Sequence, residues 1–179
     1  MSGEINRPKD FIDRRSKIPG REIPTYLLPF RLIPGSESRY QLGDDDGNQC
    51  LTVLLLGFSG SGKSMLVEVL GNYILGVEFH DVDRFQVRRK DGPTDTITSY
   101  TFFTRYTRRF PRPITVIDTP GFQRGTPGPD LKLIGDIRTF VHLHHKQRID
   151  AVIYVVPGSQ VAFASIIQIR SITLLPKEN

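Results

Sequence analysis

Apolar residues in this chain form short continuous runs and one clear helical stripe, separated by polar stretches. The runs 51–56 and 114–118 are apolar almost throughout, which is typical of strands covered on both faces. Between 64 and 75 the apolar residues recur at the helical period, and Gly76 follows as a suitable C-terminal cap. The pattern predicts two buried strands and a helix whose buried stripe comprises Leu66, Val67, Leu70, Tyr73 and Ile74.

The remaining pattern predicts further alternation of strands and helices. The elements that we expect are a loop over 80–97, a strand rich in Thr, Tyr and Phe over 99–107, a Gly/Pro-rich loop over 121–129, a helix over 130–146, a strand over 151–156 and the start of another helix over 161–175. Such alternation favours an α/β domain with a mostly parallel sheet between two layers of helices.

Residues 1–49 have a different character. Prolines recur there at positions 8, 19, 24, 29 and 34, a spacing that excludes a long helix. The stretch 26–33 is apolar enough to pack on a neighbouring domain as an extended arm. We therefore expect a Pro-rich N-terminal extension over 1–49, of which 1–40 is at best partly ordered, and a domain over 50–179.

Composition narrows the class of protein. The chain has 179 residues, one cysteine and a net charge of +5. A single cysteine excludes a disulfide framework, and the sequence has neither a secretory signal nor an apolar run long enough to cross a membrane. We therefore expect a cytoplasmic location. Eight basic residues against Asp91 and Asp95 give 84–112 a charge of +6. This cluster could attract nucleic acid, an anionic membrane or an acidic partner surface, but no nucleic-acid motif accompanies it, and we interpret it as a solvated loop and strand edge.

The segment 57–64, Gly-Phe-Ser-Gly-Ser-Gly-Lys-Ser, follows the first buried strand and opens the first helix. This G-x-x-x-x-G-K-S pattern predicts a phosphate-binding loop, because its glycines let successive N–H groups point at an anion. Lys63 can reach the β- and γ-phosphates, and the Ser64 hydroxyl can bind Mg²⁺. The predicted nucleotide contacts are Gly57, Phe58, Ser59, Gly60, Ser61, Gly62, Lys63, Ser64 and Met65.

A second motif, Asp118-Thr119-Pro120-Gly121, ends the buried strand 114–118. The Asp118 carboxylate should lie at the carboxyl edge of the sheet beside the phosphate-binding loop, where it can hold the Mg²⁺ shell. Gly121 would let a backbone N–H approach a γ-phosphate. The two motifs together therefore predict a site for a nucleotide with Mg²⁺.

Because of these two motifs, residues 50–175 resemble the P-loop GTPases. The resemblance is closest to the septins and the GIMAP-type GTPases, in which the D-T-P-G motif is followed by an apolar residue, as Phe122 follows it here. The resemblance implies GTP or GDP with Mg²⁺ and a switch threonine before the second strand. Thr94, Thr96 and Thr98 are candidates, and we favour Thr98 because the family's threonine usually follows an apolar residue. The implied catalytic set is Lys63, Thr98 and Gly121, and the implied metal set is Ser64, Thr98 and Asp118.

Two departures from the family pattern affect the expected activity. Phe122 stands where many small GTPases carry a water-orienting Gln, which predicts slow hydrolysis. The guanine-reading N/T-K-x-D segment is not found within 1–179, so we expect an incomplete domain with little discrimination between GTP and ATP.

The sequence leaves three functions open. The first is a slow GTP-hydrolysing switch, the second is a nucleotide-dependent assembly module that forms homo- or hetero-oligomers, and the third is an ATP-binding P-loop protein. His142, His144 and His145 fall within one helical turn, and we interpret them as a solvated helix end rather than a metal site.

Overall fold

The computed structural model describes residues 16–88, 94–123, 127–145, 148–157 and 172–173. Its elements in chain order are β1 (Thr25–Leu27), β2 (Arg31–Leu32), β3 (Arg39–Leu42), β4 (Leu51–Gly57), α1 (Lys63–Leu75), β5 (Arg84–Gln86), β6 (Thr98–Phe102), a 3₁₀ helix (Thr104–Tyr106), β7 (Ile114–Asp118), α2 (Pro127–His144), β8 (Arg148–Ile149), β9 (Ala151–Val155) and β10 (Ile172–Thr173).

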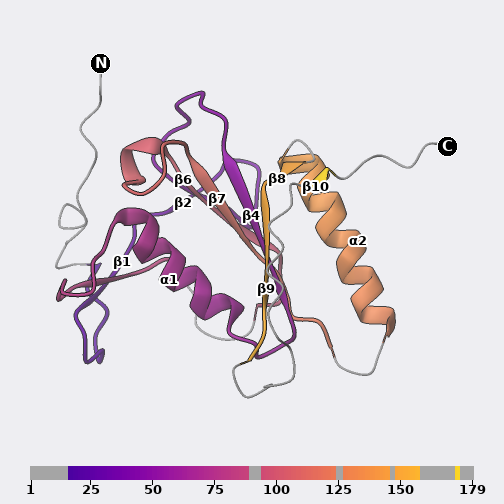
Figure 1. The fold of residues 1–179 in the computed structure, drawn as a ribbon, viewed down its shortest axis with the longest axis horizontal. Helices are drawn as coiled ribbons and strands as arrows, with labels where there is room; N and C mark the ends of the chain where they lie inside the picture. The colour runs from indigo at the N-terminus through magenta and orange to yellow at the C-terminus, as the bar shows by residue number, and fades with distance from the viewer. Residues whose placement is uncertain (1–15, 89–93, 124–126, 146–147, 158–171, 174–179) are drawn as a thin grey trace.

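The main sheet has six strands in the order β2-β3-β6-β7-β4-β9. The pairs β3–β6, β7–β4 and β4–β9 are parallel, whereas β2–β3 and β6–β7 are antiparallel. The helices α1 and α2 lie on opposite sides of this sheet (Figure 1). The predicted class, a mostly parallel sheet in a three-layer α/β/α arrangement, is confirmed.

Alternation along the two central strands builds the two halves of the core. Leu55 of β4 and Val116 of β7 pack in one cluster with Val67 of α1, while Leu54 and Ile117, their neighbours in sequence, pack in a second cluster with residues of α2. Successive side chains of a strand point to opposite faces, so the continuous apolar runs are explained by burial on both sides.

The central predicted elements are confirmed, with small shifts at their ends. Strands occupy 51–57, 114–118 and 151–155, α1 begins one residue before the predicted helix, and α2 runs over 127–144 instead of 130–146. The predicted strand over 99–107 is wrong in its second half. It ends at Phe102, because the chain turns into the 3₁₀ helix, in which Tyr106 N–H donates to Phe103 O at 2.8 Å.

Two further predictions need correction. The expected loop over 80–97 contains β5, which pairs in parallel with β1. The expected helix over 161–175 lies mostly outside the described residues, but its end is wrong, since β10 is a strand that pairs with β8. Partner strands distant in sequence decide both outcomes, and local periodicity carries no signal for them.

The N-terminal segment is more integrated than its prolines predict. From residue 16 onward it supplies β1, β2 and β3, and β3 joins the main sheet beside β6. Leu28, Phe30 and Leu42 are at most 1% exposed and belong to the same core cluster as Val67 and Phe102. Residues 16–40 are therefore part of the folded structure, and the part of the expectation that concerns 1–15 lies outside the described residues. The boundary between 49 and 50 stays a prediction.

The buried stripe of α1 is narrower than predicted. Val67 and Ile74 are buried, but Tyr73 is 47% exposed. On α2 the buried positions are Leu133, Ile137 and Val141, while Leu131, Ile134 and Leu143 are exposed. Neither helix of the described chain has the length and apolar character that a membrane crossing requires.

Candidate functional site

The loop between β4 and α1 has the curled backbone that its sequence predicts. Gly57 ends β4 with φ 149°, and Gly62 caps α1 in the left-handed region with φ 98°. A Cβ on Gly57 would lie 2.5 Å from Val155 O, so a side chain there would push β9 away. Glycine is therefore required by the neighbouring strand at Gly57, and by the left-handed backbone at Gly62.

Lys63 lies at the base of this loop and is 5% exposed. Its Nζ donates to Gly57 O and Phe58 O, each at 3.0 Å. Burial lowers the pKa of this ammonium group, and the nearby Asp118 carboxylate partly opposes that change. The loop's own carbonyls thus hold a buried positive charge at the place where a phosphate would bind.

A cavity of about 390 Å³ opens above the loop. Its lining brings together the two predicted motifs and one switch candidate, namely Ser59, Gly60, Ser61, Gly62, Lys63, Ser64, Thr94, Thr119 and Gly121. The Met65 side chain lies apart from this set and is 69% exposed on the outer face of α1. Gly57 and Phe58 of the predicted set do not line the cavity either, and residues 59–64 surround a space suited to a polyphosphate.

At one side of the cavity three oxygen-bearing side chains converge. Ser64 Oγ lies 2.8 Å from Thr94 Oγ1 and donates to Asp118 Oδ2 at 3.2 Å, and Thr94 Oγ1 donates to the same carboxylate oxygen at 3.1 Å. Asp118 is fully buried, and its other oxygen, Oδ1, is buried without a hydrogen-bond partner among the described residues. A buried carboxylate oxygen in that position is suited to a cation.

Burial and the neighbouring polar groups have opposite effects on the pKa of Asp118. Burial raises the pKa of its carboxyl group, while hydrogen bonds from Thr94 and Ser64 and the charges of Arg88 and Lys63 act in the opposite direction. One carboxylate with two hydroxyl groups fits Mg²⁺, which takes few protein ligands and completes its shell with water and phosphate oxygens. The described chain holds no cluster of three His, Cys, Asp or Glu residues of the kind that forms an all-protein metal site.

Of the three candidate threonines, the structure brings Thr94 to this group. Thr98 is opposite Asp118 in the β6–β7 register, but its hydroxyl donates to Thr96 O at 3.2 Å, and the Thr96 hydroxyl donates to Asp95. The preference for Thr98 therefore has no geometric support here. An apolar neighbour in the sequence does not identify Thr94, because its place in the site is defined by contacts with Ser64 and Asp118, which are distant in sequence.

Gly121 lies directly against the phosphate-binding loop. A Cβ at this position would be 2.3 Å from both Ser59 N and Ser59 Cα. The backbone around it is paired with the loop, since Ser59 N–H donates to Phe122 O at 2.9 Å and Phe122 N–H donates to Gly57 O at 3.1 Å. The second motif is thus joined to the first by main-chain hydrogen bonds, and any residue larger than glycine would separate them.

Sequence reasoning missed one residue of this group, Arg88, which was counted only in the basic cluster. Its Nε lies 3.8 Å from Asp118 Oδ2, and its Nη2 donates to Thr94 Oγ1 at 3.3 Å. No sequence motif marks this arginine, because it reaches the site only through the packing of 84–88 on α1.

The histidines at the end of α2 were interpreted as solvated, which is wrong for His145. Its Nε2 is buried without a hydrogen-bond partner among the described residues, and its ring lies 5.6 Å from that of Phe140. Burial lowers the pKa of His145 to about 4, with smaller contributions from Arg39 and His144. His142 is exposed, as predicted.

Comparison with known proteins gives one family and one solved structure of interest. A search of the curated proteins gives no match. A crystal structure of a dimerization-deficient mutant of Toc33 from Arabidopsis thaliana is 23% identical, with a TM-score of 0.37, over 68% of this chain and 41% of that chain. The family model described as "50S ribosome-binding GTPase" matches residues 52–175, which include both motifs and most of the chain. The chain therefore belongs to this GTPase family.

Proposed function

We propose that this protein binds GTP and GDP with Mg²⁺ and acts as a slowly hydrolysing switch of the septin and GIMAP type. The observation that carries the proposal is the convergence of Ser64, Thr94 and Asp118 at a cavity whose base holds Lys63. Membership of a GTPase family supports guanine as the base.

In this proposal each part of the site has one task. Backbone N–H groups of the loop and the Lys63 ammonium bind the β- and γ-phosphates. Ser64 and Asp118 hold Mg²⁺, which would neutralise charge on the phosphate oxygens. Thr94, rather than Thr98, is the switch threonine, since its hydroxyl already contacts both of them.

Slow hydrolysis follows from the residue after Gly121. Phe122 has no hydrogen-bonding group with which to orient an attacking water, and its backbone is engaged with the loop. The rate should therefore depend on a group supplied from elsewhere.

Calorimetry with GDP, and in parallel with ADP, tests the proposal when each titration is run in Mg²⁺ and in EDTA. We expect GDP binding that weakens in EDTA, and single-turnover hydrolysis of GTP over minutes or longer. Equal GDP affinity in Mg²⁺ and EDTA would contradict the metal role, and binding of ADP in preference to GDP would favour the ATP-binding alternative.

A nucleotide-dependent assembly module is the second candidate. Leu131 and Ile134, three positions apart on α2, are 68% and 52% exposed, and a partner subunit that packs on this side of the helix would cover both. Size-exclusion mass measured in GDP and in a non-hydrolysable GTP analogue tests this alternative. A change of mass with nucleotide, without measurable turnover, would favour assembly over switching.

A further inference from the structure

Arg88 places a positive charge beside the Asp118 carboxylate, whose other oxygen, Oδ1, is suited to Mg²⁺. Its guanidinium group faces Asp118 Oδ2, the same atom that accepts hydrogen bonds from Ser64 and Thr94. The side chain of Arg88 is only 15% exposed, and that of Asp118 is 1% exposed. The pair is therefore largely shielded from the solvent. In such a shielded position, the attraction between opposite charges is much stronger than at the protein surface.

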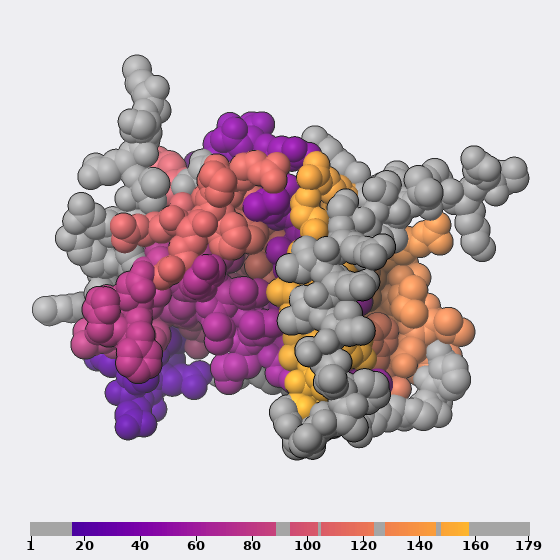
Figure 2. Space-filling view, viewed as in Figure 1, coloured from indigo at the N-terminus to yellow at the C-terminus, as the bar shows by residue number. Residues whose placement is uncertain are grey.

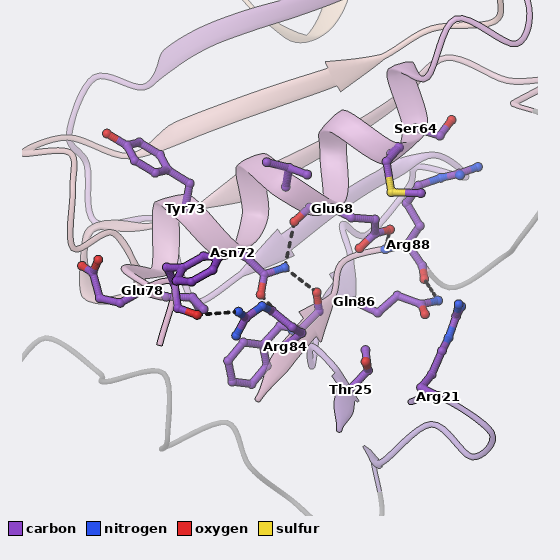
Figure 3. Close-up of a pocket in the computed structure, with 15 residues that line it drawn as sticks. Arg21, Thr25, Ser64, Glu68, Asn72, Tyr73, Glu78, Arg84, Gln86 and Arg88 are labelled. Carbon is purple, nitrogen blue, oxygen red and sulfur yellow. Dashed lines mark hydrogen bonds between the residues drawn. The ribbon is translucent and has the colours of Figure 1, made fainter. Parts of the chain in front are cut away.

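The backbone that carries Arg88 is fixed to α1 by two side chains one helical turn apart. Glu68 accepts hydrogen bonds from Val87 N–H at 2.6 Å and from Arg88 N–H at 3.1 Å. Asn72 bonds both backbone groups of Phe85, accepting from its N–H at 2.9 Å and donating to its carbonyl at 2.7 Å. Figure 3 shows Ser64, Glu68 and Asn72 along this side of α1, with Arg88 next to Ser64.

The close approach of this segment also explains a glycine inside α1. A Cβ on Gly71 would lie 2.2 Å from Val87 Cγ2, so a larger residue would force the segment off the helix. Glycine in a helix interior costs about 1 kcal/mol relative to alanine. Gly71 lies where residues 85–88 pack on α1, and glycine there allows their close approach in spite of this cost. The packing of this segment on α1 therefore determines the position of Arg88.

Cations that share one carboxylate repel each other. The Arg88 guanidinium lies 3.8 Å from the buried Asp118 carboxylate, and Mg²⁺ would need the same carboxylate. We propose that Arg88 and Mg²⁺ compete for Asp118, so that Arg88 sets the Mg²⁺ concentration at which nucleotide binds and transmits metal binding to Thr94 and the 84–88 segment. This inference rests on the proposed function.

The test is a Mg²⁺ titration of GDP binding at fixed GDP concentration, on the full chain. Arg88→Gln should lower the Mg²⁺ midpoint at least threefold, because the competing charge is gone, and Arg88→Lys should keep most of the wild-type midpoint. Arg109→Gln is the matched control, since Arg109 pairs with Glu78 at 2.6 Å on the surface. If Arg88→Gln fails to fold, Arg88→Met retains the aliphatic stem and serves in its place.

Thermal unfolding in EDTA gives a readout that does not need nucleotide. Arg88→Gln should lower Tm in an otherwise wild-type chain, because it removes a positive charge beside the buried Asp118 carboxylate. It should lower Tm much less in an Asp118→Asn background. The double-mutant cycle thus measures the pair directly.

The outcomes separate the two proposals. Mg²⁺-dependent GDP binding with an unchanged midpoint in folded Arg88→Gln overturns this inference and leaves the proposed function intact. A raised midpoint with weaker GDP binding also overturns it, because it would mean that Arg88 contacts the phosphates and supports the metal. Absence of GDP binding by the wild-type chain overturns both proposals.

Discussion

Gly121 and Ser59 are in such close backbone contact that the added methyl group of alanine would lie 2.3 Å from Ser59 N. Gly121→Ala should therefore lower the free energy of unfolding by about 1–3 kcal/mol, the usual range for an overpacked site. It should also weaken nucleotide binding, because the loop must move. Chemical denaturation and GDP calorimetry measure the two effects.

Gly135→Ala is the control for that substitution. Gly135 lies within α2, and a Cβ there would meet no atom within 4 Å, so alanine should stabilise the protein by about 0.5–1 kcal/mol. Equal effects of the two substitutions would contradict the steric explanation for Gly121.

Lys63→Ala should weaken nucleotide binding at least tenfold, because the ammonium group provides a charge-assisted contact to the phosphates. The loss of its hydrogen bonds to Gly57 O and Phe58 O should also lower Tm by a few degrees. Lys132→Ala removes an exposed lysine that pairs with Asp136 and should change neither property. Unchanged affinity in a folded Lys63→Ala protein would remove the phosphate-loop interpretation.

Saturating GDP with Mg²⁺ should stabilise the wild-type chain by about 2.7 kcal/mol at 100 times the dissociation constant. Asp118→Asn should reduce this gain and its sensitivity to EDTA, since the carboxylate supports the metal shell. Thermal shift assays with and without EDTA measure both quantities. If the gain in Asp118→Asn still disappears on addition of EDTA as it does in the wild-type chain, the metal is held elsewhere.

Acid should destabilise the protein through His145. Its pKa is lowered to about 4 in the folded state and is about 6.5 when unfolded, so between these values only the unfolded chain takes up the proton. The stability is complete above pH 6.5 and falls as the pH decreases toward 4, by up to about 3 kcal/mol. Denaturation at several pH values should show this slope, and His145→Gln should flatten it.

His142→Gln serves as the control for the pH series, because His142 is exposed. A slope that is unchanged in His145→Gln, or that disappears in His142→Gln, would assign the acid sensitivity to another group.

The sequence predicts those parts of the molecule whose signals are local. The buried runs at 51–56 and 114–118, the helix from 64 and the position of Asp118 all follow from periodicity and from motifs of a few residues. Their mutual placement follows from parallel pairing of β4 with β7, which brings both motifs to one edge.

The remainder depends on contacts between residues distant in sequence. β1 has only three residues and pairs with β5 about sixty positions later, so neither strand has a pattern of its own. Arg88 reaches Asp118 because Glu68 and Asn72 hold residues 85–88 on α1. In Figure 2 the first described residues, in indigo, lie against the magenta surface that includes residues near β5. The proline pattern of this segment does not predict that contact.

The parallel pairing of β3 with β6 has a consequence for biosynthesis. Arg39 is opposite Ser99, 60 residues later in the chain. At the usual elongation rate of about 5–20 residues per second, the ribosome needs roughly 3–12 s to make that interval. During this time β3, which includes Leu42, and its buried neighbours Leu28 and Phe30 have been made without the strand that completes their side of the sheet. The nascent chain is therefore most exposed to aggregation in this interval, and chaperone binding would be most useful then.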